Sequence, residues 1–262
     1  MHRLITALLV SAFAAGPALA ASPLDGTWKA DLASVKWPSK PDVYEIKGGT
    51  YTCRSCVPPV TVKADGAFHR VTGHPYYDEQ AVKIVNARTV TFAQRKGGKA
   101  MGEATDTVSA DGRTMTYTFR DTSSPNGKIV TGSGTEERIG RPIPGAHALS
   151  GSWRNTSMGD MTDAGLIVAM RTEGNIVHMS TPTGISYAAR LGGPAVPVNG
   201  DPAHTMAAVK RTNASTYVET DTRGGKVVQI ITMTALAGGK AMHVGVVDRV
   251  QGTTWSYKAL KQ

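Results

Sequence analysis

The two cysteines of the chain, Cys53 and Cys56, have a spacing that redox, haem and metal sites all use. Thioredoxin-type chemistry needs such a pair at the start of a helix, which lowers the thiol pKa. Here Pro58 and Pro59 follow, and no strand–helix–strand pattern surrounds the pair. Haem attachment needs a histidine at position 57, which is valine, and a zinc ribbon needs a second cysteine pair. We therefore expect a local disulfide, the usual state in an exported protein, with catalytic redox as the alternative.

Histidines and carboxylates gather in the segment from Phe68 to Glu79. The residues that resemble metal ligands there are His69, His74, Asp78 and Glu79. Their spacing fits no closed zinc or calcium loop, so we expect a solvated connecting loop and no metal site. Tyr76 and Tyr77, in the same segment, are candidate ligand contacts.

The second half of the chain is rich in methionine, with seven of the ten, and has no phenylalanine. His178, His204 and His243 lie in the same half, so a site for a soft metal such as Cu(I) is one hypothesis. Strand alternation places the His243 and Met242 side chains on opposite faces of their strand, which argues against a shared metal site. Methionine fills irregular cores, and core packing is the prediction we favour.

Catalytic signatures are missing from the sequence: it has no nucleophile elbow, phosphate-binding loop or His-Glu-x-x-His motif. A constellation assembled across strands would leave no local trace, so an enzyme stays an alternative. The sequence favours a protein without catalytic activity and without a cofactor.

An internal duplication organises the chain. Residues 71–121 match residues 198–248 at 18 of 51 positions without a gap, at an offset of 127. Gly26-Thr27-Trp28 and Gly151-Ser152-Trp153 open the two halves. A period of this length means two domains and not a solenoid of short repeats. The Pro/Gly-rich stretch 140–145 is the expected linker, which predicts domains at 21–145 and 146–262.

Each half alternates apolar and polar residues with period two, as in Met115-Thr116-Tyr117-Thr118-Phe119. Turn signals such as Gly97-Gly98 and Asp111-Gly112 separate these runs, as in hairpins. The pattern predicts an all-β chain. About eight strands in each half would hide their edges by closing, so we expect two tandem antiparallel β-barrels, with a β-sandwich as the alternative.

The Gly-x-Trp at the start of the first strand, followed by hairpin-linked strands, resembles the calycin group of lipocalins and fatty-acid-binding barrels. The mature chain also resembles secreted bacterial proteins with two lipocalin-like domains. The resemblance implies that Trp28 and Trp153 plug the closed ends of the barrels. It implies that Arg138 is the closing arginine of the first half, whereas the second half offers Lys258 or Lys261 nearby. Neither half carries the Thr-Asp-x-Tyr motif typical of lipocalins.

Composition, charge and the first twenty residues indicate the class of protein and its compartment. Apolar residues make up 40% and charged residues 19% of the 262, which excludes disordered and integral membrane classes. The net charge of +9 is dispersed, whereas nucleic-acid-binding proteins concentrate it on one face with aromatics. Residues 1–20 have a basic start, an apolar run and Ala18-Leu19-Ala20. They predict a signal peptide cleaved near Ala20, and so a periplasmic or secreted protein without a transmembrane segment.

Together these features predict an exported, non-enzymatic protein that binds a small apolar or amphipathic molecule. The expected ligand contacts are Tyr76, Tyr77 and Arg138 in the first barrel, with the guanidinium pairing with a carboxylate. The alternative is a structural or interaction module of the cell envelope whose barrels are filled by their own side chains. An enzyme with an unrecognised site is a third hypothesis.

Overall fold

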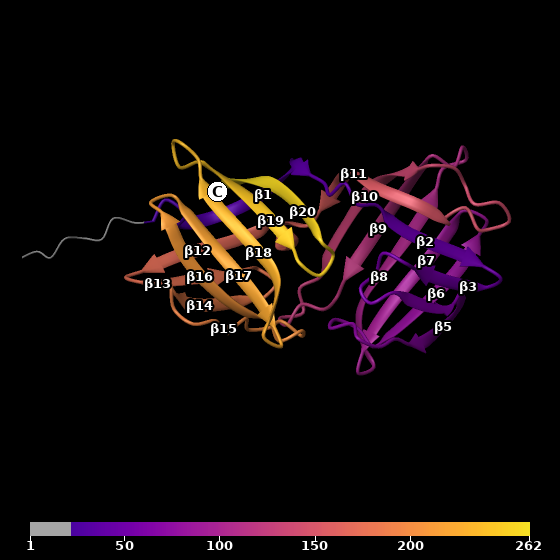
Figure 1. Ribbon diagram of the computed structural model, residues 1–262, viewed down its shortest axis with the longest axis horizontal. Coiled ribbons are helices and arrows are strands. Elements are labelled where there is room, and N and C mark those ends of the chain that lie inside the picture. The colour runs from indigo at the N-terminus through magenta and orange to yellow at the C-terminus, as the bar shows by residue number, and fades with distance from the viewer. Residues whose placement is uncertain (1–21) are drawn as a thin grey trace, which may run out of the picture.

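The protein is built from two antiparallel ten-stranded sheets, each curled into a nearly closed barrel (Figure 1). The computed structural model describes residues 22–262. The expected signal peptide at residues 1–20 lies outside the described residues. Within residues 22–262, no helix has the length and apolar character needed to cross a membrane.

The first barrel has the strand order β4-β3-β2-β11-β10-β9-β8-β7-β6-β5. Its strands are β2 (Asp42–Lys47), β3 (Thr50–Cys53), β4 (Val60–Lys63), β5 (Asp65–Arg70), β6 (Glu79–Asn86), β7 (Thr89–Lys96), β8 (Lys99–Val108), β9 (Thr114–Asp121), β10 (Val130–Ile139) and β11 (Gly151–Met161). The edge strands β4 and β5 are separated by one residue, so the chain itself brings the two edges together.

The second barrel has the order β14-β13-β12-β1-β20-β19-β18-β17-β16-β15. Its strands are β1 (Gly26–Lys36), β12 (Ile167–Glu173), β13 (Ile176–Ser180), β14 (Ser186–Arg190), β15 (Val196–Pro197), β16 (Met206–Asn213), β17 (Thr216–Arg223), β18 (Lys226–Ala235), β19 (Ala241–Asp248) and β20 (Thr253–Lys261). An isolated bridge between Ser186 and Asn199 joins the edge at β14 to the chain that follows β15.

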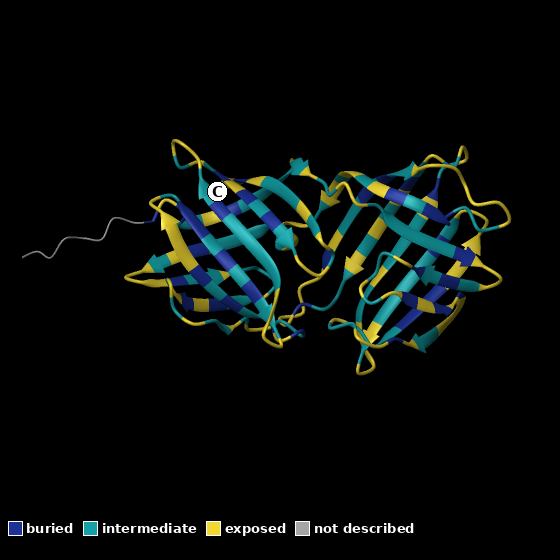
Figure 2. Ribbon diagram, viewed as in Figure 1, coloured by how far each residue is buried: buried dark blue, intermediate teal, exposed yellow. Residues whose placement is uncertain are grey.

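Side chains alternate between the barrel interior and solvent, as strand geometry requires (Figure 2). In β4, for example, Val60 and Val62 are buried, whereas Thr61 and Lys63 are exposed. The inward residues form two separate apolar cores, one in each barrel. The expected all-β architecture with two antiparallel barrels is confirmed, and the sandwich alternative is not the fold.

The strands recur along the chain as the duplication predicts. β6 to β9 begin at Glu79, Thr89, Lys99 and Thr114, and β16 to β19 begin 127 residues later in each case. Cross-strand pairs recur as well, since Val108 opposite Met115 corresponds to Ala235 opposite Met242. Residues can therefore be compared between the barrels position by position.

The two barrels exchange their Gly-x-Trp strands. β1, from the N-terminal half of the sequence, pairs with β12 and β20 of the second barrel. β11, from the C-terminal half, pairs with β2 and β10 of the first. In Figure 1 the indigo β1 lies among the orange and yellow strands. The sheets therefore do not divide the chain into 21–145 and 146–262. The first barrel is continuous from β2 to β11, and the second combines β1 with β12 to β20.

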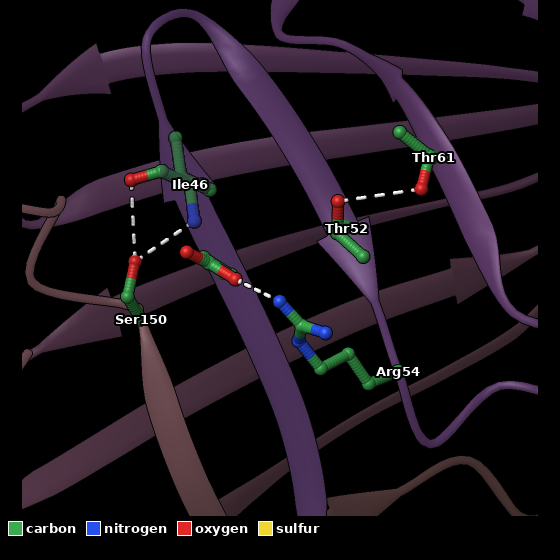
Figure 3. A network of polar contacts seen from close by, with 6 residues as sticks. Ile46, Thr52, Arg54, Thr61 and Ser150 are labelled. Atoms are coloured by element: carbon green, nitrogen blue, oxygen red, sulfur yellow. Dashed lines mark hydrogen bonds and ion pairs between the residues drawn. The ribbon is translucent and has the colours of Figure 1, made fainter.

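Local connections explain this pairing. The chain between β1 and β2 contains Pro38 and Pro41, whose fixed φ angles oppose a tight hairpin that would fold β1 back onto β2. β11 instead follows β10 as the second arm of a hairpin, with Arg138 opposite Trp153. Ser150 fixes the start of β11 against β2, because its hydroxyl accepts from the Ile46 amide at 2.8 Å and lies 3.3 Å from the Ile46 carbonyl (Figure 3).

Candidate functional site

A cavity of about 520 Å³ lies inside the first barrel. Most of its lining comes from inward positions of β2, β3 and β6 to β9 and from the loop between β5 and β6, while the exposed Glu103 and Arg120 border it. The lining residues are Tyr44, Tyr51, Cys56, Tyr76, Tyr77, Gln80, Phe92, Gln94, Met101, Gly102, Glu103, Ala104, Asp106, Phe119, Arg120, Asp121 and Ser123. The volume falls in the range of small-molecule sites, about 300–1,000 Å³.

Aromatic rings form much of the cavity wall. The ring centroids of Tyr44 and Tyr51 lie 6.3 Å apart in a stacked arrangement. Phe92 meets Tyr51 edge to face at 5.4 Å. These rings come from the β2–β3 hairpin and from β7, so segments distant in sequence build one apolar surface. Aromatic surfaces of this kind bury large areas of a ligand and orient it through ring geometry.

Two inward glycines of β10 make room for aromatic rings of β9. A Cβ at Gly132 would lie 2.6 Å from the ring of Phe119, and a Cβ at Gly134 would lie 2.2 Å from the Tyr117 hydroxyl oxygen. The corresponding positions of the second barrel carry Trp255 and Tyr257, which stack on each other with centroids 5.6 Å apart. The same inward positions therefore hold no side chain in one barrel and two large rings in the other.

Three carboxyl groups face the interior of the first barrel: Asp42, Asp106 and Glu136. Burial raises the pKa of Asp106 to about 7. Burial, with repulsion from Asp42 and Asp106, raises the pKa of Glu136 to about 8, and Asn155 opposes this shift in part. The pKa of Asp42 is also raised by burial, although Ser55 and Lys40 oppose the rise. These groups are candidates for a functional role, because carboxyls are seldom buried without a partner.

Tyr76 and Tyr77 lie at the mouth of the cavity, in the loop where the sequence placed them. The Tyr77 ring stacks on His74 with centroids 4.7 Å apart. Tyr76 is 45% exposed, and its hydroxyl accepts a hydrogen bond of 2.9 Å from Arg223 of the second barrel. Lys96 also links the two barrels, because its ammonium donates to the carbonyl of Pro202, between β15 and β16, at 2.8 Å.

Arg138, the third expected ligand contact, lies apart from Tyr76 and Tyr77 and does not line the cavity. Its guanidinium donates to the backbone carbonyls of Gly112 and Ser150, each at 2.6 Å, and to that of Ala148. The guanidinium carbon also lies 4.1 Å from the ring centroid of Trp153. With its donors bound to the backbone, Arg138 holds the Trp153 end of the barrel together and is not available to a ligand carboxylate.

Trp28 and Trp153 are fully buried, one in each barrel. Each indole nitrogen donates at 2.8 Å to the carbonyl four residues earlier, at Leu24 and Leu149 respectively. The ammonium of Lys261 lies 5.2 Å from the Trp28 ring centroid, in the place that Arg138 occupies over Trp153. The two tryptophans are thus equivalent core residues of the second and first barrels.

The cysteines, histidines and methionines singled out from the sequence form a disulfide, an ion pair and core contacts. Cys53 and Cys56 form a disulfide, and Cys56 also borders the cavity. His69 pairs with Asp65 at 2.8 Å. Within residues 22–262, no group of three or more His, Cys, Asp or Glu side chains is arranged to hold a metal ion. Met170, Met233 and Met242 are buried in the core of the second barrel.

The second barrel has interior carboxyls of its own at different positions. The Tyr187 hydroxyl donates to Glu219 at 2.6 Å. Burial and the neighbouring Asp221 raise the pKa of Glu219 to about 8, and burial raises the pKa of Asp221 to about 6. Where the first barrel has Asp42, Asp106 and Glu136, the second has apolar side chains. These are Val168, Met233 and Ala259.

Sequence reasoning missed the interior carboxyls. Asp106 lies at an inward position of β8 between Ala104 and Val108, so strand alternation marks it as buried. Its repeat partner is Met233, an apolar residue. An acidic residue at a position where the other copy is apolar is the signal that could have identified it.

Comparison with known proteins finds one weak structural match and no sequence match. No family model and no curated protein matches the chain. Among solved structures, an outer membrane channel from Pseudomonas putida F1 aligns over 94% of this chain and 98% of that chain, at 8% sequence identity and a TM-score of 0.19. A similarity this weak carries no argument about fold or function.

Proposed function

We propose that the protein is an exported, non-enzymatic binding protein whose first barrel holds one small amphipathic molecule. The observation that carries the proposal is the cavity of about 520 Å³ inside that barrel. Its lining combines aromatic rings with a few polar groups, which is the usual composition of a small-molecule site. Barrels of this kind have room for a single small ligand within their walls.

The likeness to calycins is part of the proposal. In each barrel a Gly-x-Trp strand buries its tryptophan, and a cationic side chain covers the ring: Arg138 over Trp153 and Lys261 over Trp28. The tryptophan end is thus packed shut in both. The ligand would enter the first barrel at the end where Tyr76 and Tyr77 lie.

Two features support export: the signal-like sequence of residues 1–20 and the disulfide between Cys53 and Cys56. The signal segment predicts transfer out of the cytoplasm, into the periplasm or the medium. A disulfide between Cys53 and Cys56 persists in such an oxidising compartment.

A filled-barrel interaction module is the second candidate, and the second barrel favours it. Trp255 and Tyr257 occupy inward positions at which the first barrel has glycine. Met233 and Met242 add to a continuous buried core. We propose a division of roles in which the first barrel binds the molecule and the second serves as a packed scaffold beside its mouth.

A neutral apolar dye tests the proposed function. N-phenyl-1-naphthylamine brightens in apolar surroundings and should do so with the mature protein at a stoichiometry of one. Ala104→Phe places a ring in the cavity and should abolish the signal. Thr107→Phe adds the same ring on the exposed face of the same strand and should leave it unchanged. Equal brightening by both variants would reject the cavity as the binding site.

A further inference from the structure

Two side chains of the cavity wall, Gln80 and Asp106, present hydrogen-bond acceptors for which the structure supplies no donor. The Gln80 side chain lines the cavity and is only 5% exposed, yet its Oε1 atom is buried without a hydrogen-bond partner. Asp106 also lines the cavity, and its raised pKa has burial as its cause, with no hydrogen bond to oppose it. A buried acceptor without a donor destabilises the folded protein, so a ligand that supplies donors here gains binding energy.

Glu136 is a second buried carboxyl of the first barrel with one oxygen left without a donor. It is 5% exposed, and its Oε2 atom has no hydrogen-bond partner in the structure. Repulsion from Asp42 and Asp106 acts on it, which shows that the three carboxyls share one low-dielectric interior. The first barrel thus concentrates carboxyl groups where the second barrel, at the same positions, is apolar.

The two nearby lysines donate hydrogen bonds to backbone carbonyls and form no ion pair with the interior carboxyls. Lys96, at the mouth, donates to the carbonyls of Pro75 and Pro202. Lys40 opposes the pKa rise of Asp42, but its ammonium donates to the Gln251 carbonyl at 2.7 Å.

Two further arginines do not neutralise the interior. Arg138 is held at the Trp153 end of the barrel by backbone carbonyls. Arg120 borders the cavity but is exposed, since it lies on the outer face of β9 next to the inward Phe119. Within residues 22–262, none of the three interior carboxyls forms an ion pair, and Lys40, which opposes the pKa rise of Asp42, is the one cation that acts on any of them.

We propose that the ligand of the first barrel is a cationic amphiphile, a protonated amine on an apolar body, whose ammonium group binds Asp106 and the Gln80 carbonyl oxygen. This inference rests on the proposed function and names its ligand class. An ammonium group has three donors and no acceptor, which matches the Asp106 carboxylate and the unpartnered Gln80 Oε1 atom. Its charge compensates buried carboxylates, and the rings of Tyr44, Tyr51 and Phe92 provide faces for its apolar body and for cation–π contact.

The structure argues against an anionic ligand. A carboxylate in this cavity would face Asp106 and lie near Asp42 and Glu136, and the one cationic lining side chain, Arg120, is on the exposed outer face of β9. Like charges at close range in a low-dielectric interior repel strongly. The preference expected from Arg138 for anionic amphiphiles is thus reversed by the groups that line the cavity.

Three ligands with one ring system and different head groups test the inference. Isothermal titration calorimetry of the mature protein at pH 7.5 would compare 1-naphthylmethylamine, 1-naphthalenemethanol and 1-naphthylacetic acid. The amine should bind at least tenfold more tightly than the alcohol, and the acid more weakly than the alcohol. Asp106→Asn removes the charge but keeps the shape, so it should reduce amine affinity to the level of the alcohol and leave alcohol affinity unchanged.

Glu219→Gln is the matched control, because it neutralises a buried carboxyl of the other barrel and should leave all three affinities unchanged. Gln80→Leu, which removes the unpartnered oxygen, should weaken the amine selectively. Equal affinities for the three head groups, or amine affinity that survives Asp106→Asn, would overturn the inference while leaving the cavity as a binding site. No binding of any of the three ligands would contradict the proposed function as well.

Discussion

The guanidinium of Arg138 stacks on Trp153 at 4.1 Å, although the two residues lie on opposite sides of residues 140–145, which the sequence predicted to be the linker between domains and which connect β10 to β11 within one barrel. Its counterpart, Lys261, covers Trp28 at the other extreme of the chain. Each barrel is thus closed by a strand from the other half of the sequence. This relationship changes which fragments can fold and which variants affect which barrel.

Fragments divided by barrel and not by sequence repeat should fold. Residues 37–162 contain every strand from β2 to β11, so they should give a cooperative melt with β-type circular dichroism. Residues 21–145 lack β11 and leave the edges of β2 and β10 unpaired, which favours aggregation. A cooperative melt of 21–145 together with an unfolded 37–162 would contradict the strand exchange.

Arg138→Ala should destabilise the protein without weakening ligand binding. Removing charged hydrogen bonds to three backbone carbonyls should lower the free energy of unfolding by about 2–3 kcal/mol. Arg113→Ala, an exposed arginine nearby, should change it by less than about 0.5 kcal/mol. Urea denaturation measures both. A stable Arg138→Ala protein with reduced affinity for 1-naphthalenemethanol would instead place Arg138 in the binding site.

Trp28→Ala should cost about 3–5 kcal/mol, as expected for a buried aromatic side chain. Because β1 belongs to the second barrel, the loss should be local to that barrel. Hydrogen exchange should show faster exchange in β12 and β20, while β2 and β10 keep their protection. Trp153→Ala is the mirror-image control and should produce the opposite pattern. Exchange that rises first in β2 and β10 of Trp28→Ala would argue against the exchanged topology.

The stability of the protein should depend on pH through its interior carboxyls. The folded pKa of Asp106, about 7, and of Glu136, about 8, exceed the ordinary values of 3.8 and 4.5. Between about pH 4 and pH 8 the folded state therefore binds more protons than the unfolded state, so stability falls as the pH rises through this window. Asp42, Glu219 and Asp221 shift in the same direction.

The double variant Asp106→Asn, Glu136→Gln isolates the contribution of the first barrel. Urea denaturation at pH 5 and pH 8.5 should show a smaller loss of stability in the double variant than in the unmodified protein. An unchanged difference between the two pH values would mean that these two carboxyls do not titrate as their burial implies.

Much of the architecture could be predicted from the sequence because the repeat and the period-two pattern are local signals. The strand from Thr114 to Asp121 and the turn at Gly97-Gly98 follow from such signals, whereas the burial of Trp28 and Trp153 is implied by the resemblance to calycins. The strand exchange could not, since β1 and β11 carry the same Gly-x-Trp pattern. Either strand satisfies the alternation of either barrel, so the partner is decided by connections and long-range pairing.

The candidate site was predicted in part. Tyr76 and Tyr77 lie at the cavity, as their loop position suggested, but Arg138 does not. The role of Arg138 depends on three carbonyls from other segments, which no spacing in the sequence reveals. The grouping of Asp42 with Asp106 is likewise a product of barrel closure, because they come from strands far apart in the sequence.

A crystal structure of the protein soaked with 1-naphthylmethylamine tests the central claim most directly. The account predicts one naphthyl ring inside the first barrel, packed against Tyr51 and Phe92, with its ammonium group within hydrogen-bond distance of Asp106 and Gln80 Oε1. A ligand found in the second barrel or on an outer face, with the first cavity left to water at saturating ligand, would contradict it.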